Sequence, residues 1–255
     1  MILRLLTYNI RHGGGGREDR LLAVIRRCDP DVVVFQEATR PDVVAKLAAG
    51  ATMPHWGSRP RQSLGFMSRV PVSHHEWHRP RLSRHAFLEI VLGSSGFRIF
   101  GLHLSAVHAA WTERRRVLEL RALLKSIARH QEGFHVLAGD FNTLSPGELL
   151  DIRQLPRRLR ALVWLSGGAV RWRTIQIVLD ARYVDGFRQH HPDVAGFTFP
   201  TWRPHVRLDY VFVPAPFADR LRSCEIVAGE DVAAASDHMP LLAEVALPET
   251  SAPGT

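Results

Sequence analysis

Cysteine is scarce in this chain: Cys28 and Cys224 are the only two among 255 residues. Two cysteines are too few for a disulfide framework, and no Cys/His zinc spacing surrounds them. No apolar run approaches the roughly 20 residues of a membrane-spanning helix, and the N-terminal residues enter a strand-like pattern without a cleavage region. These absences exclude a disulfide-rich scaffold and a transmembrane protein. They favour a soluble protein of the reducing cytoplasm without a signal peptide.

Lysine is equally rare, because Lys46 and Lys125 are the only lysines among 33 basic residues. The chain nevertheless has a net charge of +8 and an isoelectric point near 10.6, which favours anionic partners. Arginine suits two-pronged contacts with phosphate better than lysine does, but an arginine bias also follows from genomic base composition. The charge is therefore supporting evidence only.

The composition is that of a globular protein, with 45% hydrophobic and 23% charged residues and a mean hydropathy of −0.08. A chain of this length can bury a substantial core, and neither an internal repeat nor a dividing linker interrupts it. We therefore expect one domain over residues 1–247, followed by a flexible tail over residues 248–255.

Apolar runs and amphipathic stripes alternate along the chain, which predicts a mixture of strands and helices. One helix is expected to begin with Thr112 as its N-cap and to end at Gly133, with Glu113 in its first turn and Arg114 to Arg116 on a solvated face. Further helices are expected over residues 18–28 and 41–49, and strands over residues 2–10, 32–35, 64–68, 72–77, 86–92, 97–103, 134–138, 207–213, 222–228 and 241–246.

Two segments carry ambiguous signals. The glycine run Gly13–Gly16 lacks the Lys-Ser/Thr ending of a nucleotide-binding loop, so a flexible loop is the better interpretation. Residues 145–196 interleave arginines with aromatic residues. They predict either two short surface helices or a basic, aromatic surface for nucleic acid or anionic lipid heads. In the first case one helical face would be formed by Trp172, Ile175, Leu179 and Tyr183.

Strand ends along the whole chain present polar side chains of similar chemistry. The apolar run from Phe134 to Ala138 ends in Gly139, and Asp140 and Asn142 then fall on one side of an extended backbone. Other expected strands end in the same way, which predicts one cleft above one edge of a sheet core. Carboxylate and carboxamide oxygens at such an edge suit a hard divalent cation, Mg²⁺ or Mn²⁺. The full set is Asn9, Glu37, His103, Asp140, Asn142, Asp209, Asp237 and His238.

Six short motifs occur in order along the chain: Thr7-Tyr8-Asn9-Ile10, Phe35-Gln36-Glu37, His103-Leu104, Gly139-Asp140-Phe141-Asn142, Arg207-Leu208-Asp209-Tyr210 and Ser236-Asp237-His238. Together they resemble the motifs of the endonuclease/exonuclease/phosphatase family, and they span residues 7–238. The resemblance implies a four-layer αββα sandwich of the α/β (α+β) class, with two mixed β-sheets packed face to face and helices outside. It also implies an enzyme that hydrolyses phosphate esters.

The resemblance further implies a metal site. Glu37 would be the principal ligand of the ion, and Asn9 would hold metal or water beside it. Asp237 would complete or tune the site. The ion expected from this set of donors is Mg²⁺ or Mn²⁺.

The same resemblance implies catalytic roles for other members of the set. Asp140 would orient and deprotonate the attacking water, and Asn142 would position the phosphate. Asp209 would orient His238, and the two would act as an acid–base and charge-stabilising pair. His103 would donate to a non-bridging phosphate oxygen.

Departures from the subgroups of the family bear on the substrate. His103-Leu104-Ser105 stands where abasic-site endonucleases carry a tyrosine and asparagine motif. The paired motifs of inositol-polyphosphate 5-phosphatases are absent around Asp140 and Asp209. His103-Leu104 is more similar to the deoxyribonuclease I-like, deadenylase-like and sphingomyelinase-like branches. Leu64 stands where relatives often place an asparagine, which puts one phosphate-side contact in question.

Three functions stay open. We favour a phosphodiesterase of nuclease type, because the net charge suits the polyanionic backbone of nucleic acid. The alternative is a lipid phosphodiesterase or phosphatase, in which Leu159 to Val170 with flanking arginines would lie at an anionic lipid surface. The third is a non-enzymatic binding protein on the same fold, and the intact set of polar residues speaks against it. The sequence predicts no particular oligomeric state.

Overall fold

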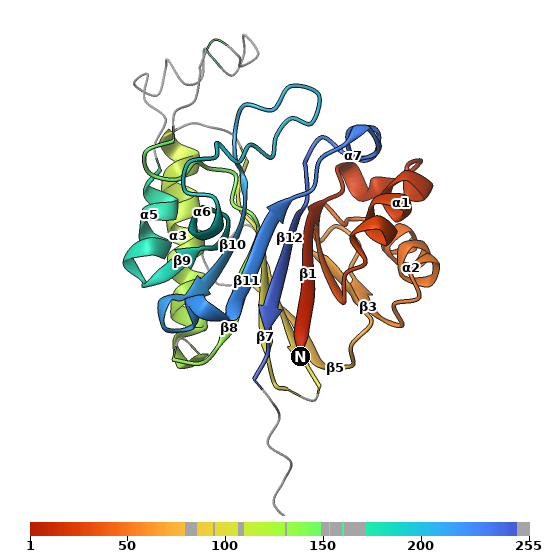
Figure 1. Ribbon diagram of the computed structural model, residues 1–255, viewed down its shortest axis with the longest axis horizontal. Coiled ribbons are helices and arrows are strands. Elements are labelled where there is room, and N and C mark those ends of the chain that lie inside the picture. The colour runs from red at the N-terminus through yellow and green to blue at the C-terminus, as the bar shows by residue number, and fades with distance from the viewer. Residues whose placement is uncertain are drawn as a thin grey trace, which may run out of the picture.

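The structure, a computed structural model, describes residues 1–79, 86–93, 95–106, 110–130, 132–148, 153, 160 and 172–248. Over these residues the chain forms two β-sheets of six strands each, packed face to face, with helices on both outer faces (Figure 1). The predicted four-layer αββα sandwich is therefore confirmed. Two predictions lie outside the described residues: the flexible tail beyond Pro248, and most of the basic, aromatic segment, including nearly all of Leu159 to Val170.

The first sheet has the strand order β11-β12-β1-β2-β4-β3. It is mixed, because β1 and β2 pair in parallel while the other neighbours are antiparallel. β2 is apolar along most of its length and buried throughout, as expected of a strand whose sheet is covered on both faces. The strands are β1 (Ile2–Asn9), β2 (Val32–Gln36), β3 (His55–Ser58), β4 (Gly65–Ser68), β11 (Leu221–Ile226) and β12 (Leu241–Ala246).

The second sheet has the strand order β5-β6-β7-β8-β10-β9. It is mixed as well, because β7 and β8 pair in parallel and the other neighbours are antiparallel. The register aligns His103 of β7 and Asp209 of β10 with Asp140 of β8. The strands are β5 (Val72–His78), β6 (Phe87–Leu92), β7 (Arg98–His103), β8 (His135–Asp140), β9 (Tyr183–Asp185) and β10 (Asp209–Pro214).

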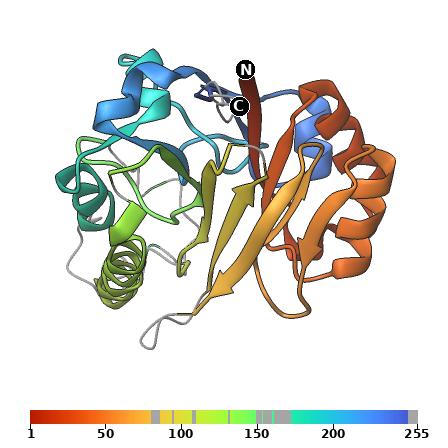
Figure 2. The same ribbon diagram turned by 90° about the horizontal axis from the view of Figure 1, so that it is seen from below.

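Helices cover the outer face of each sheet (Figure 2). α1, α2 and α7 pack on the first sheet over one apolar cluster, and α3 and α5 pack on the second sheet over another. Among the described residues, no helix is both long and apolar enough to span a membrane. The helices are α1 (Glu18–Cys28), α2 (Pro41–Gly50), α3 (Ala110–Ser126), α5 (Arg173–Asp180), α6 (Gly186–His190) and α7 (Glu230–Ala235), with short 3₁₀ turns η1 (His12–Gly14), η2 (Ala128–His130) and η4 (Ala215–Arg220).

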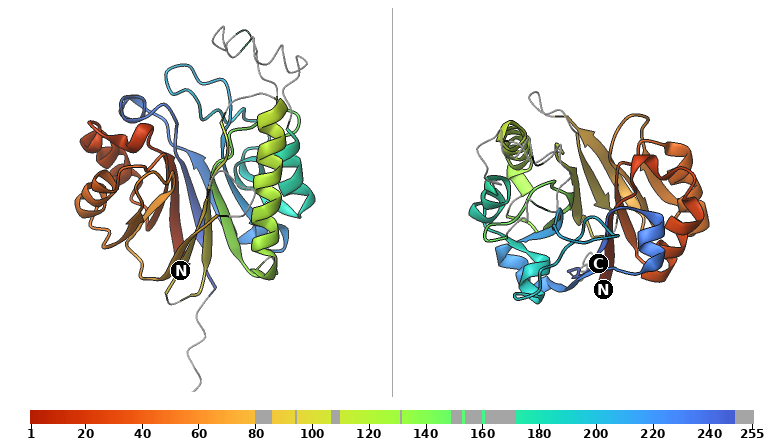
Figure 3. Two further views of the ribbon diagram at one scale, coloured as in Figure 1. Left: turned by 180° about the vertical axis from the view of Figure 1, so that it is seen from behind. Right: turned by 90° about the horizontal axis from the view of Figure 1, so that it is seen from above.

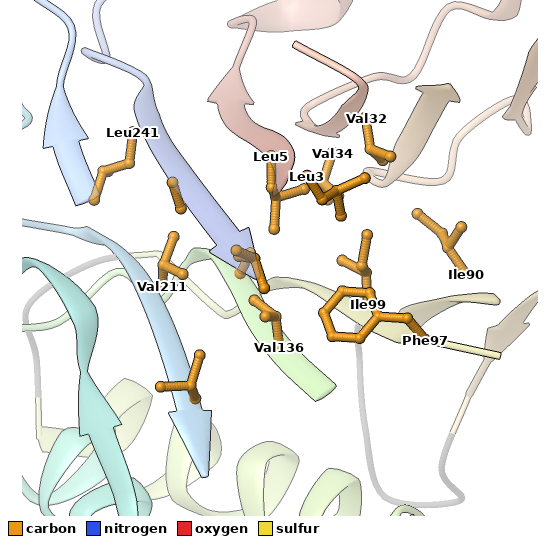
Figure 4. Packing of buried hydrophobic residues seen from close by; sticks show 14 of the residues in the cluster. Leu3, Leu5, Val32, Val34, Ile90, Phe97, Ile99, Val136, Val211 and Leu241 are labelled. Atoms are coloured by element: carbon orange, nitrogen blue, oxygen red, sulfur yellow. The ribbon is translucent and has the colours of Figure 1, made fainter. Parts of the chain in front are cut away.

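A further apolar cluster fills the space between the two sheets (Figure 4). Leu5 and Val34 of the first sheet face Ile99 and Val136 of the second, and all four are buried. The sheets approach so closely that a Cβ atom added at Gly101 would lie 2.7 Å from Val34 Cγ1. This core fixes the two sheets against each other and therefore fixes the relative position of their strand ends.

The predictions for α3 are partly wrong. The helix begins at Ala110, so Thr112 lies within it rather than at its N-cap. Alanine is the strongest helix former and extends the helix beyond the expected start. The helix ends at Ser126, and η2 separates it from the expected stop. Arg116 is buried against Glu113 instead of lying on a solvated face. Arg114 and Arg115 are exposed as predicted.

Other local differences concern short elements. Tyr183 belongs to β9 rather than to a helical face with Ile175 and Leu179, and Trp172 precedes α5. The glycine run was expected to be a flexible loop, but it includes the 3₁₀ turn η1. The sequence pattern also missed β3, α6 and α7. Each of these elements has six residues or fewer, too few to establish a hydrophobic period.

Gly139 is the residue at which the backbone conformation is most demanding for the site. It has φ of +148°, and a Cβ atom there would lie 2.0 Å from the carbonyl oxygen of Leu102. We expect Gly139→Ala to destabilise the fold by about 3 kcal/mol or more, because neighbouring strand backbone cannot move aside.

The matched control is Gly96→Ala, since Gly96 has φ of +63° and open space around the added atom. It should cost only about 1 kcal/mol for the left-handed backbone. Urea unfolding followed by circular dichroism measures both variants. Equal losses of stability would contradict the steric argument.

Candidate active site

Strands β1, β2, β7 and β8 end, and β10 begins, at the same end of the sandwich (Figure 3). The predicted site residues lie on or next to these strand ends and in the turn before β12. In the second sheet, His103, Asp140 and Asp209 are register partners on three neighbouring strands, so their side chains stand side by side. In the first sheet, Asn9 ends β1 and Glu37 follows β2 directly. The core between the sheets brings both sets of strand ends to the same edge.

Asp140 is the centre of the contacts across this edge. Its carboxylate is buried, and Oδ2 accepts a hydrogen bond of 3.1 Å from the amide of Asn9 in the other sheet. Oδ1 accepts the backbone N–H of Asn142 at 2.8 Å. Burial, and then the negative charge of Asp209, raise the pKa of Asp140 to about 7, against the opposing effects of His238 and the two hydrogen bonds. Asp140 is therefore poised to exchange a proton at neutral pH.

His238 and Asp209 form a buried pair beside Asp140. Nδ1 of His238 lies 2.9 Å from Asp209 Oδ2, and Nε2 lies 3.9 Å from Asp140 Oδ2. Burial alone would lower the pKa of His238, but the charge and hydrogen bond of Asp209, with the charges of Asp140 and Asp237, raise it to about 10. The imidazole is therefore protonated at neutral pH, and Asp209 fixes its orientation.

Glu37 enters the site on a strained backbone, because its φ of +57° lies in the left-handed region. Its Oε2 accepts the backbone N–H of His12 at 2.5 Å, and its Oε1 lies 3.5 Å from Nδ2 of Asn9. Burial would raise the pKa of Glu37, but the His12 N–H and the neighbouring imidazoles outweigh it and hold the pKa below its usual value. Glu37 is thus an anionic oxygen donor at neutral pH.

His103 and Asn142 lie on either side of this centre. Nδ1 of His103 is hydrogen-bonded to the hydroxyl of Ser63, and Nε2 lies 3.7 Å from Asp140 Oδ2. Asn142 has φ of +52° and donates its side-chain amide to the carbonyl of Leu104 at 2.9 Å. The loops that follow β7 and β8 are therefore bonded to each other next to the site.

Asp237 lies at the rim, where its Oδ2 is 3.4 Å from Nε of Arg11. Its charge also contributes to the raised pKa of His238. The structure thus brings together every residue predicted for the site, with Asp237 at the margin. Ligand atoms of Asp140, Asp209 and His238 lie within 4.8 Å of one another, close enough to hold a metal ion.

Ser63 is a site residue that the sequence did not single out. Its hydroxyl accepts the backbone N–H of Glu37 at 3.1 Å and bonds to His103, so it joins the two sheets. The sequence directed attention to Leu64 instead, because relatives often have asparagine there. Leu64 is buried in the core between the sheets. No feature of the sequence identifies the serine beforehand.

The loop before β10 supplies further contacts that the sequence analysis missed. Oγ1 of Thr198 accepts the backbone N–H groups of Leu208 and Asp209 at 3.0 and 3.3 Å. The ring of Phe199 lies 4.8 Å from the ring of His238. The only signal in the sequence is the alternation of aromatic and polar residues just before the Asp209 motif.

The two packed mixed sheets, with buried carboxylates and an imidazole at their strand ends, are the arrangement that the resemblance to the phosphoesterase family implies. The chain belongs to the Endonuclease/Exonuclease/phosphatase family, whose family model matches residues 6–238. No curated protein sequence matches the chain. The predicted family and its implied fold are thereby confirmed.

Solved structures share this fold. The 3′ phosphatase NExo from Neisseria, bound to a product DNA hairpin, superposes with a TM-score of 0.72 at 20% identity over 95% of this chain and 99% of that chain. The 3′-5′ exonuclease NExo from Neisseria meningitidis gives 0.71 at 20% identity over the same shares of the two chains. An AP endonuclease from Archaeoglobus fulgidus gives 0.73 at 18% identity, over 94% of this chain and 98% of that chain. At these identities the likeness establishes the fold.

The pair of His238 and Asp209 predicts how the protein responds to pH. Because the folded pKa of His238, about 10, lies above the ordinary histidine value of 6.5, the pair stabilises the fold fully below pH 6.5. That contribution declines as the pH rises through about 10. Asp209→Asn should lower the pKa of His238 by about 1–3 units and flatten this decline.

The measurement is an NMR titration of the histidine ring in the metal-free protein, beside urea unfolding at several pH values. His191→Asn is the control, because His191 bonds to Glu225 of β11, which belongs to the other sheet from Asp209. An unchanged titration of His238 in Asp209→Asn would contradict the assignment of its raised pKa to Asp209.

Proposed function

We propose that the protein is a phosphodiesterase of nuclease type that depends on Mg²⁺ or Mn²⁺, with residues 1–247 as its catalytic domain. The observation that carries the proposal is the pair of Asp140 and His238, 3.9 Å apart. Their surroundings raise the pKa of Asp140 to about 7 and that of His238 to about 10. One group can accept a proton at neutral pH and the other can donate one. A phosphate and an attacking water placed beside this pair would meet both a base and an acid.

The residues at this edge fit a hard divalent cation. Glu37 is anionic, and Asn9 and Asp237 add amide and carboxylate oxygens. Burial is the main cause of the raised pKa of Asp140 and the charge of Asp209 is the second, so a cation bound beside them would offset the repulsion between two carboxylates. Glu37 with Asn9 would hold the ion, and Asp237 would complete or tune the site. When bound, the ion would neutralise charge that develops on the phosphoryl oxygens.

The remaining residues act on water and phosphate. Asp140 would orient the attacking water and take its proton, and Asn142 would position the phosphate. His103 would donate to a non-bridging oxygen, since its Nδ1 is engaged by Ser63 and its Nε2 lies on the Asp140 side.

The pair of His238 and Asp209 would stabilise the negative charge that develops during the reaction. Protonated His238 would stabilise the developing negative charge and supply a proton to the leaving oxygen. Asp209 would keep Nδ1 of His238 bonded, so that Nε2 faces the reaction.

Nucleic acid is the substrate that the surroundings of the site favour. Trp202 is 65% exposed, and its ring lies 6.4 Å from that of Phe199, which in turn packs on His238. An exposed indole that contacts the site through the ring of Phe199 can stack on a nucleobase. The net charge of +8 supports the same substrate, as does the structure of similar fold from Neisseria that is bound to a DNA hairpin. The lipid alternative depends on Leu159 to Val170, almost all of which lies outside the described residues.

Removal of either member of the acid–base pair should abolish turnover. We expect Asp140→Asn and His238→Ala to lower kcat by a factor on the order of 10²–10⁴, because each acts on a proton in the transition state. Chelation of divalent ions with EDTA should abolish the wild-type reaction, and Mg²⁺ should restore it. Hydrolysis of bis(p-nitrophenyl) phosphate and of labelled oligonucleotides measures these effects.

Asp19→Asn is the matched control, because Asp19 is exposed on α1. It should leave kcat unchanged. Near-wild-type turnover by either site variant would refute the assigned roles, and turnover that survives EDTA would refute the metal dependence.

Trp202→Ala should weaken binding of single-stranded DNA by roughly 5- to 100-fold, which corresponds to the loss of about 1–3 kcal/mol of stacking. The salt dependence of binding should stay the same, because tryptophan neutralises no phosphate. Fluorescence anisotropy with the inactive Asp140→Asn protein measures both quantities. Trp56→Ala is the control, since Trp56 is 41% exposed on the edge strand β3. Equal binding losses in the two variants would rule out a stacking role for Trp202.

A further inference from the structure

Helix α3 buries three charged side chains, Glu113, Arg116 and Glu119, with exposed fractions of 4%, 2% and 3%. They are spaced three residues apart and contact the neighbouring loops rather than solvent. We call them the α3 triad. Two carboxylates and one guanidinium together carry a net charge of −1. Such a group is unusual inside a protein, because charged side chains are rarely buried unless they are paired.

One half of the α3 triad holds the loop that follows β7. Nη1 of Arg116 donates to the carbonyl of Ser105 at 2.8 Å. The carboxylate of Glu119 accepts both the backbone N–H and the hydroxyl of Ser105 at 3.1–3.3 Å. Both main-chain polar groups of Ser105 are therefore fixed by α3. Ser105 stands two residues after His103, so this loop has little freedom to move that imidazole.

The other half holds the loop that follows β8. Oε2 of Glu113 accepts the hydroxyl of Thr143 at 3.3 Å and two N–H groups of Arg116 at 2.8 and 3.1 Å. Oε1 accepts the backbone N–H and hydroxyl of Thr174 at 2.7 and 2.9 Å, which ties in the start of α5. Thr143 follows Asn142 directly. The α3 triad thus contacts the backbone of Ser105, two residues after His103, and the side chain of Thr143, which follows Asn142.

Burial of the charged α3 triad is weak evidence for a stabilising role. Charges removed from water lose solvation that their mutual attraction often fails to recover, and apolar side chains of similar volume are frequently as stable. Helix α3 already packs its leucines on the second sheet. What apolar residues would not supply is directed hydrogen bonds to Ser105 and Thr143.

We propose that the α3 triad is a positioning device, which holds the loops after β7 and β8 so that His103 and Asn142 face the phosphate. The inference rests on the proposed function for its catalytic consequence, but its structural content is independent of activity. Glu119 and Arg116 act through His103, and Glu113 acts through Asn142. None of the three needs to touch the substrate.

The first test reads the position of His103 directly. In ¹⁵N-histidine-labelled protein, Glu119→Ala should shift or broaden the ring signals of His103, assigned with His103→Gln. Glu119→Gln keeps the shape of the side chain and one hydrogen-bond acceptor, so the His103 signals of this variant should match those of the wild-type protein. Arg115→Met is the matched control, because Arg115 lies exposed on the same helix. Wild-type ring signals in Glu119→Ala would overturn the proposal.

The second test is a double-mutant cycle in turnover. Glu119→Ala should lower kcat by roughly 10- to 100-fold with little change in KM, as do losses of groups that orient a catalytic residue. In a His103→Ala background the same change should cost almost nothing, because its effect passes through that imidazole. An equal loss of kcat in both backgrounds would mean a general structural role and would overturn the proposal.

The two tests separate the inference from the function on which it rests. If the wild-type protein hydrolyses no phosphodiester, the proposed function fails, and the histidine spectra still decide whether the α3 triad positions His103. Where removal of Arg116 alone unfolds the protein, the double variant Glu113→Gln/Arg116→Met removes both charges and keeps an acceptor for Thr174. It should remain folded and show the lowered kcat. A folded double variant with wild-type kcat would overturn the proposal.

Discussion

A buried carboxylate stands where the two sheets meet, and the surrounding site follows from the need to stabilise it. An ionised carboxylate taken out of water is strongly unfavourable unless donors or a cation surround it. Asp140 receives N–H groups from Asn9 and Asn142 and lies beside protonated His238. Burial, and then the charge of Asp209, oppose these contacts and raise the pKa of Asp140 to about 7. Opposing effects therefore hold one carboxyl group near its titration midpoint at neutral pH, where proton transfer is easiest.

The sequence predicts this centre well because the fold places it at strand ends. Buried strands are recognisable as short apolar runs, and a polar residue that ends such a run has to lie at the edge of a sheet. Asp140, His103 and Asn9 each end a buried strand, and Glu37 follows one. The hydrophobic pattern alone therefore located most of the site, and the order of the motifs identified the family. Neither the hydrophobic pattern nor the motifs determined which sheet each strand joins, because strand pairing depends on contacts between residues that are distant in sequence.

The buried polar residues could not be recognised in the sequence for one physical reason: burial of a polar side chain leaves no trace in the local hydrophobic pattern. Arg116 sits in a run of three arginines, and only the tertiary contact with Glu113 distinguishes it from its exposed neighbours. Ser63 lies in a polar turn, and its role depends on the approach of Glu37 and His103 from two different sheets. Such residues become visible only when the loops of both sheets are placed together. Sequence reasoning is therefore strongest for strand ends and weakest for the groups that orient them.

Arg17 extends this reasoning from geometry to charge. Its guanidinium donates to the carbonyls of Ile10 and Arg11 after β1 and to that of Ala235 before the Ser-Asp-His turn. One side chain thus joins the two segments that carry Asn9 and His238. Its hydrogen-bond partners among the described residues are carbonyls, whereas Arg207 is buried between the carboxylates of Glu148 and Asp185. Two arginines that look alike in the composition therefore differ in effect: Arg17 joins two segments that carry site residues, whereas Arg207 neutralises buried carboxylates.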